Sequence, residues 1–159
     1  MSESEILQRL SDLGLDLPAV TPPVASYVPV VEAGGLAFVS GQIAMVDGRQ
    51  LFPGTLGEDV TVAEGHEAAA RCALQAISNL RATLGSLDRV RRVAQVTVYI
   101  AAVAGFLEHP EVANGASELF VGVFGEAGRH ARAAVGMSSL PRGASVEVTV
   151  IAEVSPAEK

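Results

Sequence analysis

Few side chains in this sequence could act as nucleophiles or metal ligands, and their spacing carries little information. Ser40 stands in a Ser-Gly-Gln run, and the single cysteine, Cys72, lies in an alanine-rich helical stretch. Neither comes with the sharp strand-to-helix turn or the histidine pattern that activates a nucleophile. The histidines, which share no metal-ligand spacing, are His66, His109 and His130. We therefore expect neither covalent catalysis nor a metal site.

Sequence motifs for nucleotides and redox groups are missing as well. No Gly-x-Gly-x-x-Gly run follows a strand pattern, and no glycine-rich phosphate loop ends in lysine. His-Glu-x-x-His and Cys-x-x-Cys do not occur either. We therefore expect a protein that works without a cofactor.

The charge balance argues against a nucleic-acid partner. The chain carries 18 acidic and 11 basic side chains, a formal net charge of −7 at pH 7, and its only lysine is the last residue. Binding to a phosphate backbone requires a basic stripe. We interpret the one local cluster as solvated side chains at the start of a strand: Arg89, Arg91 and Arg92.

Length and composition indicate one small cytoplasmic domain. A chain of 159 residues can bury a single core. One cysteine excludes an intrachain disulfide, which fits a reducing compartment. The first residues are acidic and polar, and no stretch approaches the roughly 18 apolar residues of a membrane span. We therefore expect no membrane partner.

A short helix and a proline-rich linker are expected first. Ser2 or Ser4 can cap an amphipathic helix whose apolar residues recur every three or four positions. Three prolines within residues 18–26 then predict an extended linker. We divide the chain into an N-terminal helix and linker, residues 1–24, and a main domain, residues 25–155.

The main domain combines strand and helix patterns in the order of an α+β fold. Residues 41–59 predict a loop with a turn at Asp47-Gly48 and room for one short strand. The expected helices run from a capping box at Thr61 and Glu64 to about Leu84, and from Pro110 to about residue 124. The expected strands are residues 27–32, 36–40, 93–100, 131–137 and 144–154. Helices should cover one sheet face, and subunits could meet on the other.

Strand alternation predicts which side chains of the last two strands share a face. In residues 131–137, one face carries Arg132, Ala134 and Gly136. In residues 144–154, valines point to the core, and the side chains expected to point away are Ser145, Glu147, Thr149, Ile151 and Glu153.

Three stretches together resemble the Rid family, also called the YjgF or L-PSP family. In order, they are residues 38–42, residues 96–100 followed by Phe106 and Asn114, and residues 131–135 continued through Leu140-Pro141 to residues 146–148. Their order and spacing cover most of residues 25–154. The most specific feature is an arginine, a Leu-Pro pair and a glutamate at fixed offsets on two strands that we expect to be adjacent.

The resemblance implies a fold, an assembly and an activity. The fold would be chorismate-mutase-like, a mixed β-sheet with two helices packed on one face. Members of the family form homotrimers with active sites in the clefts between subunits. They hydrolyse 2-aminoacrylate and related enamines or imines to 2-keto acids and ammonia, so the expected partners are a small carboxylate substrate and two further copies of the chain.

Two residues carry the implied catalysis. Arg132 matches the family's carboxylate-binding arginine, whose planar guanidinium can hold a carboxylate with two hydrogen bonds. Glu147 matches the glutamate that positions or activates water. The alternatives are a surface role for Arg132 and a structural ion pair between Arg132 and Glu147.

Four further positions match secondary residues of the cleft. Tyr27 would close the pocket, whereas Ser40 and Asn114 would offer hydrogen bonds. Their alternative roles are edge packing, a strand-end turn and a solvated helix position. At Ala134 the family often has a cysteine, so only the backbone amide and carbonyl remain usable there.

The resemblance therefore favours a cofactor-free imine or enamine deaminase. One alternative is a regulatory module that binds a small carboxylate in the same cleft without turnover. Another is the ribonuclease activity of the family's older name, but the acidic charge balance and the scarcity of aromatic residues argue against it.

Overall fold

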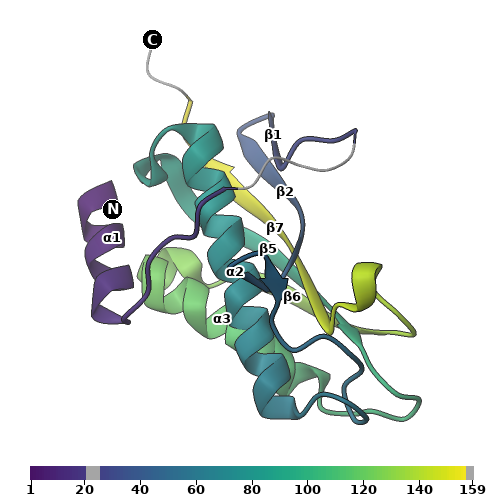
Figure 1. The fold of residues 1–159 in the computed structure, drawn as a ribbon. Coiled ribbons are helices and arrows are strands. Elements are labelled where there is room, and N and C mark those ends of the chain that lie inside the picture. Colours follow the sequence, from purple (N-terminus) through teal and green to yellow (C-terminus); the bar gives the residue numbers. More distant parts are fainter. Residues whose placement is uncertain (21–25, 157–159) are drawn as a thin grey trace.

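A single five-stranded sheet forms the centre of the protein (Figure 1). The structure is a computed structural model that describes residues 1–20 and 26–156. The strands lie in the order β1-β2-β7-β5-β6; all neighbouring pairs are antiparallel except β5 and β6, so the sheet is mixed. The strands are β1 (Val30–Ala33), β2 (Leu36–Ile43), β5 (Val90–Ala101), β6 (Ala131–Met137) and β7 (Val146–Val154).

Two long helices cover one face of this sheet (Figure 1). The predicted capping box at Thr61 and Glu64 is formed and begins α2 (Val62–Leu84). α3 (His109–Phe124) packs closely beside α2, and a methyl group on Gly115 would lie 1.9 Å from the His66 carbonyl oxygen. Close backbone approach explains the small residues of both helices. The predicted α+β fold with two helices on one sheet face is confirmed.

The N-terminal helix α1 (Glu3–Asp12) packs against α3 and joins the same core. Ser2, one of the two serines predicted as its N-terminal cap, caps this helix. Its apolar residues Ile6 and Leu10 are buried. Glu3 accepts hydrogen bonds from Arg81, Ser86 and the Leu87 amide, which attaches the helix to the end of α2. The expected boundary at residues 24 and 25 lies outside the described residues.

Two details of the fold differ from the prediction. The Asp47-Gly48 turn joins two short strands, β3 (Met45–Val46) and β4 (Arg49–Gln50), where we expected a loop with one short strand. Ser145 is 2% exposed, so its predicted outward position is wrong. The reason is that β7 begins only at Val146, and the strand alternation does not extend to the preceding residue. The short 3-10 helices are η1 (Leu87–Arg89), η2 (Gly125–Gly128) and η3 (Pro141–Gly143).

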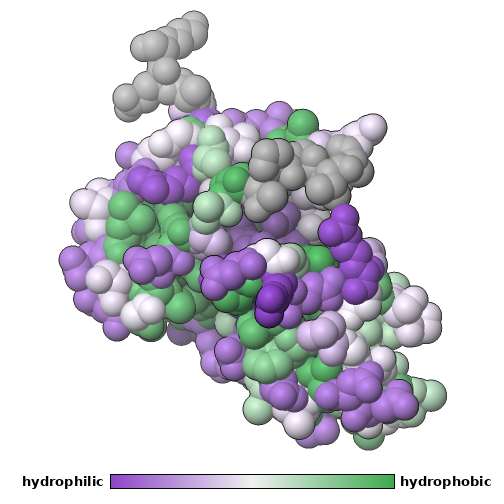
Figure 2. Space-filling view, in the orientation of Figure 1, coloured by the Kyte–Doolittle hydropathy of each residue, from purple (hydrophilic) through white to green (hydrophobic). Residues whose placement is uncertain are grey.

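The two sides of the molecule present different surfaces. Figure 2 shows the side that carries α2, where hydrophilic and hydrophobic residues alternate in small patches. The sheet face turned away from the helices exposes larger apolar side chains, namely Val31, Phe38, Val135 and Met137. Among the described helices, none has both the length and the apolar character that crossing a membrane requires.

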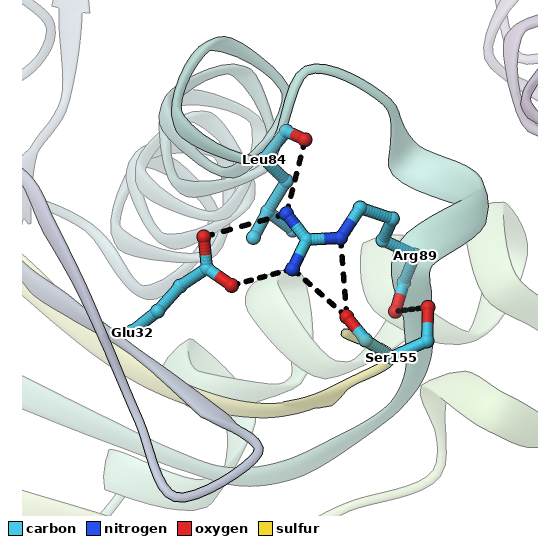
Figure 3. A network of polar contacts seen from close by, with 4 residues as sticks. All are labelled: Glu32, Leu84, Arg89 and Ser155. Atoms are coloured by element: carbon cyan, nitrogen blue, oxygen red, sulfur yellow. Dashed lines mark hydrogen bonds and ion pairs between the residues drawn. The ribbon is translucent and has the colours of Figure 1, made fainter. Parts of the chain in front are cut away.

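Arg89 is a structural residue, which corrects its interpretation as a solvated side chain. Its guanidinium donates to the Leu84 carbonyl at the end of α2, to the Glu32 carboxylate in β1, and to the Ser155 carbonyl after β7 (Figure 3). The side chain is 14% exposed. Arg91 and Arg92 are exposed, as predicted. Charge alone could not separate the three arginines.

Replacing Arg89 with alanine should destabilise the fold by about 1.5 to 3 kcal/mol, because the Glu32 carboxylate and two carbonyls lose a largely buried charged donor. Urea unfolding followed by circular dichroism measures the change. Arg91→Ala is the matched control and should stay within about 0.5 kcal/mol of the wild type. Equal effects of the two substitutions would contradict a structural role for Arg89.

Candidate functional site

Three of the six predicted site residues line one hollow of the surface. Tyr27, Ser40 and Glu147 border a cavity of about 930 Å³ along β2, which we call the β2 hollow. β1 pairs with β2 only as far as Val39, so on that side the following residues of β2 have no paired strand among the described residues, whereas their other side pairs with β7. The hollow is further bordered by residues 18–20, by α2 and by η3.

Glu147 lies in this hollow as a half-buried carboxylate. Its neighbours in β7, Val146 and Val148, point to the core, so Glu147 points to the opposite face of the sheet. None of the hydrogen bonds between described residues involves its carboxylate. Burial raises the pKa of the Glu147 carboxyl above its ordinary value. A carboxyl group whose pKa is raised in this way is better suited to accepting and returning a proton than an ordinary surface carboxyl group.

Gly41 makes room for the Glu147 carboxylate. The pairing of β2 with β7 shifts between Val39 and Gln42, so β2 contains one extra residue there, a β-bulge. A methyl group built on Gly41 would lie 1.7 Å from Glu147 Oε1. The Ser-Gly-Gln run is therefore explained by space: no larger residue fits at Gly41 while Glu147 keeps this position.

A polar stripe of α2 forms another wall of the β2 hollow. Its residues are Arg71, Gln75, Ser78 and Asn79. Arg71 Nε donates to the Met45 carbonyl at 2.6 Å, and the Met45 amide donates to Gln75 Oε1 at 2.9 Å. Asn79 donates to Gln42 Oε1 at 2.9 Å. Sequence analysis did not identify these residues, although polar side chains at helical spacing on a helix that is otherwise rich in alanine were a usable signal.

The other three predicted residues lie at the opposite edge of the sheet. Arg132 and Ala134, on edge strand β6, face α3, and Arg132 NH1 donates to Asn114 Oδ1 at 2.8 Å. The same nitrogen donates to Ser117 Oγ at 3.2 Å. Arg132 itself is exposed, whereas Ala134 is partly buried. We call Asn114, Ser117, Arg132 and Ala134 the β6–α3 cluster.

Within one chain, Arg132 and Glu147 are not neighbours. The expectation of adjacent strands is wrong, because β5 lies between β6 and β7. Arg132 is level with Val96 of β5, whereas Glu147 is level with Tyr99, three residues further along. Strand geometry then places their Cα atoms about 14 Å apart. The two side chains also point to opposite faces of the sheet, so an intrachain ion pair is excluded.

The structure thus defines an α+β protein with a helix-covered mixed sheet and two separate polar sites. The family described as "YjgF/chorismate mutase-like, putative endoribonuclease" matches residues 7–154. The chain belongs to this family.

Similar proteins include both close and distant relatives. Protein TCP17 of Trypanosoma cruzi is 44% identical over 156 residues, 98% of each chain. A crystal structure of a protein of unknown function from Agrobacterium tumefaciens is 44% identical, covers 96% of this chain and 93% of its own, and superposes with a TM-score of 0.89. More distant is a 2-iminobutanoate/2-iminopropanoate deaminase of Dermatophagoides farinae, 26% identical over 139 residues, which are 86% of this chain and 92% of that protein.

Proposed function

We propose that the protein hydrolyses small imines and enamines of the 2-aminoacrylate type, without a cofactor, to 2-keto acids and ammonia. The observation that supports this proposal is the separation of Glu147 and Arg132 within one chain. A carboxylate that no described residue pairs with lies in the β2 hollow, and a guanidinium with a partly unoccupied set of donors lies in the β6–α3 cluster. Both groups act in one reaction when Arg132 of one copy faces Glu147 of another. A closed homotrimer supplies this arrangement three times.

The chemistry follows from the groups. Arg132 binds the substrate carboxylate and thereby orients the adjacent C=N bond. Glu147 holds a water molecule, accepts one of its protons as oxygen attacks the imine carbon, and returns that proton to nitrogen. The same carboxylate then takes the proton of the new hydroxyl group and passes it to nitrogen; as the C–N bond breaks, the C=O bond forms and ammonia leaves, so imine and water become keto acid and ammonia. An enamine first requires a proton on its terminal carbon, which a protonated Glu147 supplies.

The relatives support this reaction class. The Dermatophagoides farinae protein is named as a deaminase of 2-iminobutanoate and 2-iminopropanoate, two small imino acids. Its similarity extends over 86% of the length of the present chain. The ribonuclease implied by the family description is less favoured, because the net charge of −7 would repel a phosphate backbone.

A trapping assay tests the proposal. An amino-acid lyase generates 2-aminoacrylate, and semicarbazide captures what remains of it. The wild-type protein should leave less adduct than Arg132→Ala, which we expect to lose at least about a hundredfold in rate because it loses a charged, two-point contact. Arg91→Ala, which changes an exposed arginine outside both polar sites, should match the wild type. The same adduct yield with wild type and with Arg132→Ala would refute the proposed activity.

A binding module without turnover remains the second candidate. Arg132 is anchored through Asn114 and Ser117 whether or not Glu147 is near, so the β6–α3 cluster alone could hold a carboxylate. Ligand binding to the native state alone would raise its thermal stability. Thermal stabilisation by pyruvate combined with no loss of 2-aminoacrylate would favour this candidate.

A further inference from the structure

A chain of hydrogen bonds connects Arg132 with a histidine that has no role in the proposed reaction. His130 Nδ1 lies 2.7 Å from the Gly128 carbonyl oxygen, and its Nε2 lies 3.0 Å from Ser117 Oγ. Ser117 Oγ in turn receives a bond from Arg132 NH1 at 3.2 Å. The histidine ring is half-buried and meets the edge of Phe120. His130 from the connection between η2 and β6, Ser117 from α3 and Arg132 from β6 thus form one connected group.

The partners determine which atom carries each proton. A carbonyl oxygen only accepts, so His130 Nδ1 carries the proton, and in the neutral ring Nε2 is then an acceptor. Ser117 must therefore donate its hydroxyl proton to Nε2. This leaves the lone pairs of Ser117 Oγ for Arg132 NH1. Neutral His130 thus orients the serine as an acceptor for the guanidinium.

Assigning the protons of Arg132 to acceptors in the same way shows which part of its guanidinium is left for a ligand. NH1 has two protons, and it donates to Asn114 Oδ1 and to Ser117 Oγ. Among the described residues, no acceptor bonds to Nε or NH2 of Arg132. Those two nitrogens form one edge of the guanidinium, and that edge matches the two oxygens of a carboxylate.

We propose that His130 is a positioning residue for carboxylate binding: through Ser117 it holds the Arg132 guanidinium with its Nε and NH2 edge open to the ligand. This inference rests on the proposed function only for the identity of the ligand as a small 2-keto or 2-imino acid. Protonation of His130 would turn Nε2 into a donor, leave the serine proton without its acceptor, and place a second cation beside Arg132. Carboxylate binding should therefore weaken as the pH falls.

The charged surroundings of His130 agree with this dependence. Burial, together with the positive charge of Arg132, keeps the pKa of His130 below its ordinary value, although the Gly128 carbonyl acts in the opposite direction. On η2 and next to it, Glu126 and Arg129 are paired with each other at 2.8 Å. On α3, Glu118 is bound to His66 at 3.1 Å. The ring is accordingly neutral at pH 7.

Binding of pyruvate to the full-length protein tests the chain from His130 through Ser117 to Arg132, which we call the relay. Pyruvate suits this test because it remains ionised throughout the experiment. Calorimetry at pH 7.5 and at pH 5 compares the wild type with three variants and a control. In the wild type, the dissociation constant should rise about tenfold at the lower pH, the expected loss for one hydrogen bond to a charged group. His130→Gln offers Ser117 an acceptor that does not titrate. At pH 7.5 its dissociation constant for pyruvate should lie within about twofold of the wild-type value. Its dissociation constant should also lack the part of the pH dependence that comes from protonation of His130.

The other variants separate positioning from folding. Ser117→Ala and His130→Ala should each bind pyruvate about tenfold more weakly at pH 7.5. His66→Gln changes a histidine outside the relay and should retain the wild-type pH dependence. The relay is overturned if His130→Gln keeps the full pH dependence, if Ser117→Ala binds like the wild type, or if the wild type binds no pyruvate.

Turnover measured on the same samples distinguishes the two proposals. A wild type that binds pyruvate through the relay but consumes no 2-aminoacrylate supports the relay and refutes the deaminase. A wild type that turns over while His130→Gln and Ser117→Ala leave both binding and its pH dependence unchanged refutes the relay alone.

Discussion

Mixing two inactive variants, Arg132→Ala and Glu147→Gln, should restore about a third of the wild-type deaminase rate in trimers that contain both variants. Each variant retains the half-site that the other lacks, and a single chain holds the two residues on opposite faces of its sheet. A closed trimer that contains both variants has two copies of one and one copy of the other, so roughly one of its three interfaces joins an intact Arg132 to an intact Glu147, hence about one third. Co-expression with two different affinity tags, followed by tandem purification, provides the mixed assemblies.

Each variant passed through the same procedure with itself is the control and should remain inactive. A site built within one chain predicts no recovery, because every chain of the mixture carries one defect. Recovery near zero in assemblies that contain both tags would therefore refute the division of the site between copies. Sedimentation of the wild type tests the expected trimer independently.

The local elements of the fold were predictable because their signals are local. The capping box at Thr61 and Glu64 requires only four residues, and the helix begins where the box places it. Residues 131–137 alternate so regularly that the strand bounds are confirmed, and Arg132, Ala134 and Gly136 share a face as predicted. Short-range periodicity thus identified which way each candidate side chain points.

The order of the strands was not predictable from the same signals. β6 and β7 follow each other in the chain, yet β5 lies between them and pairs with both. Consecutive strands usually lie side by side, and this sheet is an exception that no residue pattern marks. The mistake matters for function, because it placed Arg132 and Glu147 on adjacent strands of one chain, whereas the structure separates them.

Tertiary contacts explain why the roles of Arg89 and Gly41 were not predicted. Arg89, Arg91 and Arg92 are chemically equivalent in the sequence, but only Arg89 faces Glu32 and the chain after β7. Gly41 lies at the bulge inside β2, and the reason for glycine there is the carboxylate of Glu147 from another strand. Such contacts are tertiary, so the residue types indicate them only after the neighbours are known.

Glu147→Gln should abolish activity and stabilise the protein at the same time. Glutamine retains the size of the side chain but cannot accept a proton from water, so the rate should fall by about 100- to 10,000-fold. The ionised carboxylate is half-buried without a bonded partner, which costs stability that the neutral amide does not. We expect a rise in Tm of about 1 to 3 °C at neutral pH without substrate.

The pH dependence of that stabilisation has a definite sign. Because burial raises the pKa of Glu147 in the folded protein, the protonated form is favoured by folding, and the wild type loses this contribution as the pH rises through the folded pKa. The difference in Tm between Glu147→Gln and wild type should therefore be small near pH 4 and largest at neutral pH. Glu153→Gln, an exposed carboxylate of the same strand, should show no such change. A Tm below that of the wild type at pH 7 would mean that a cation already holds Glu147, and would argue against a carboxylate free to take a proton from water.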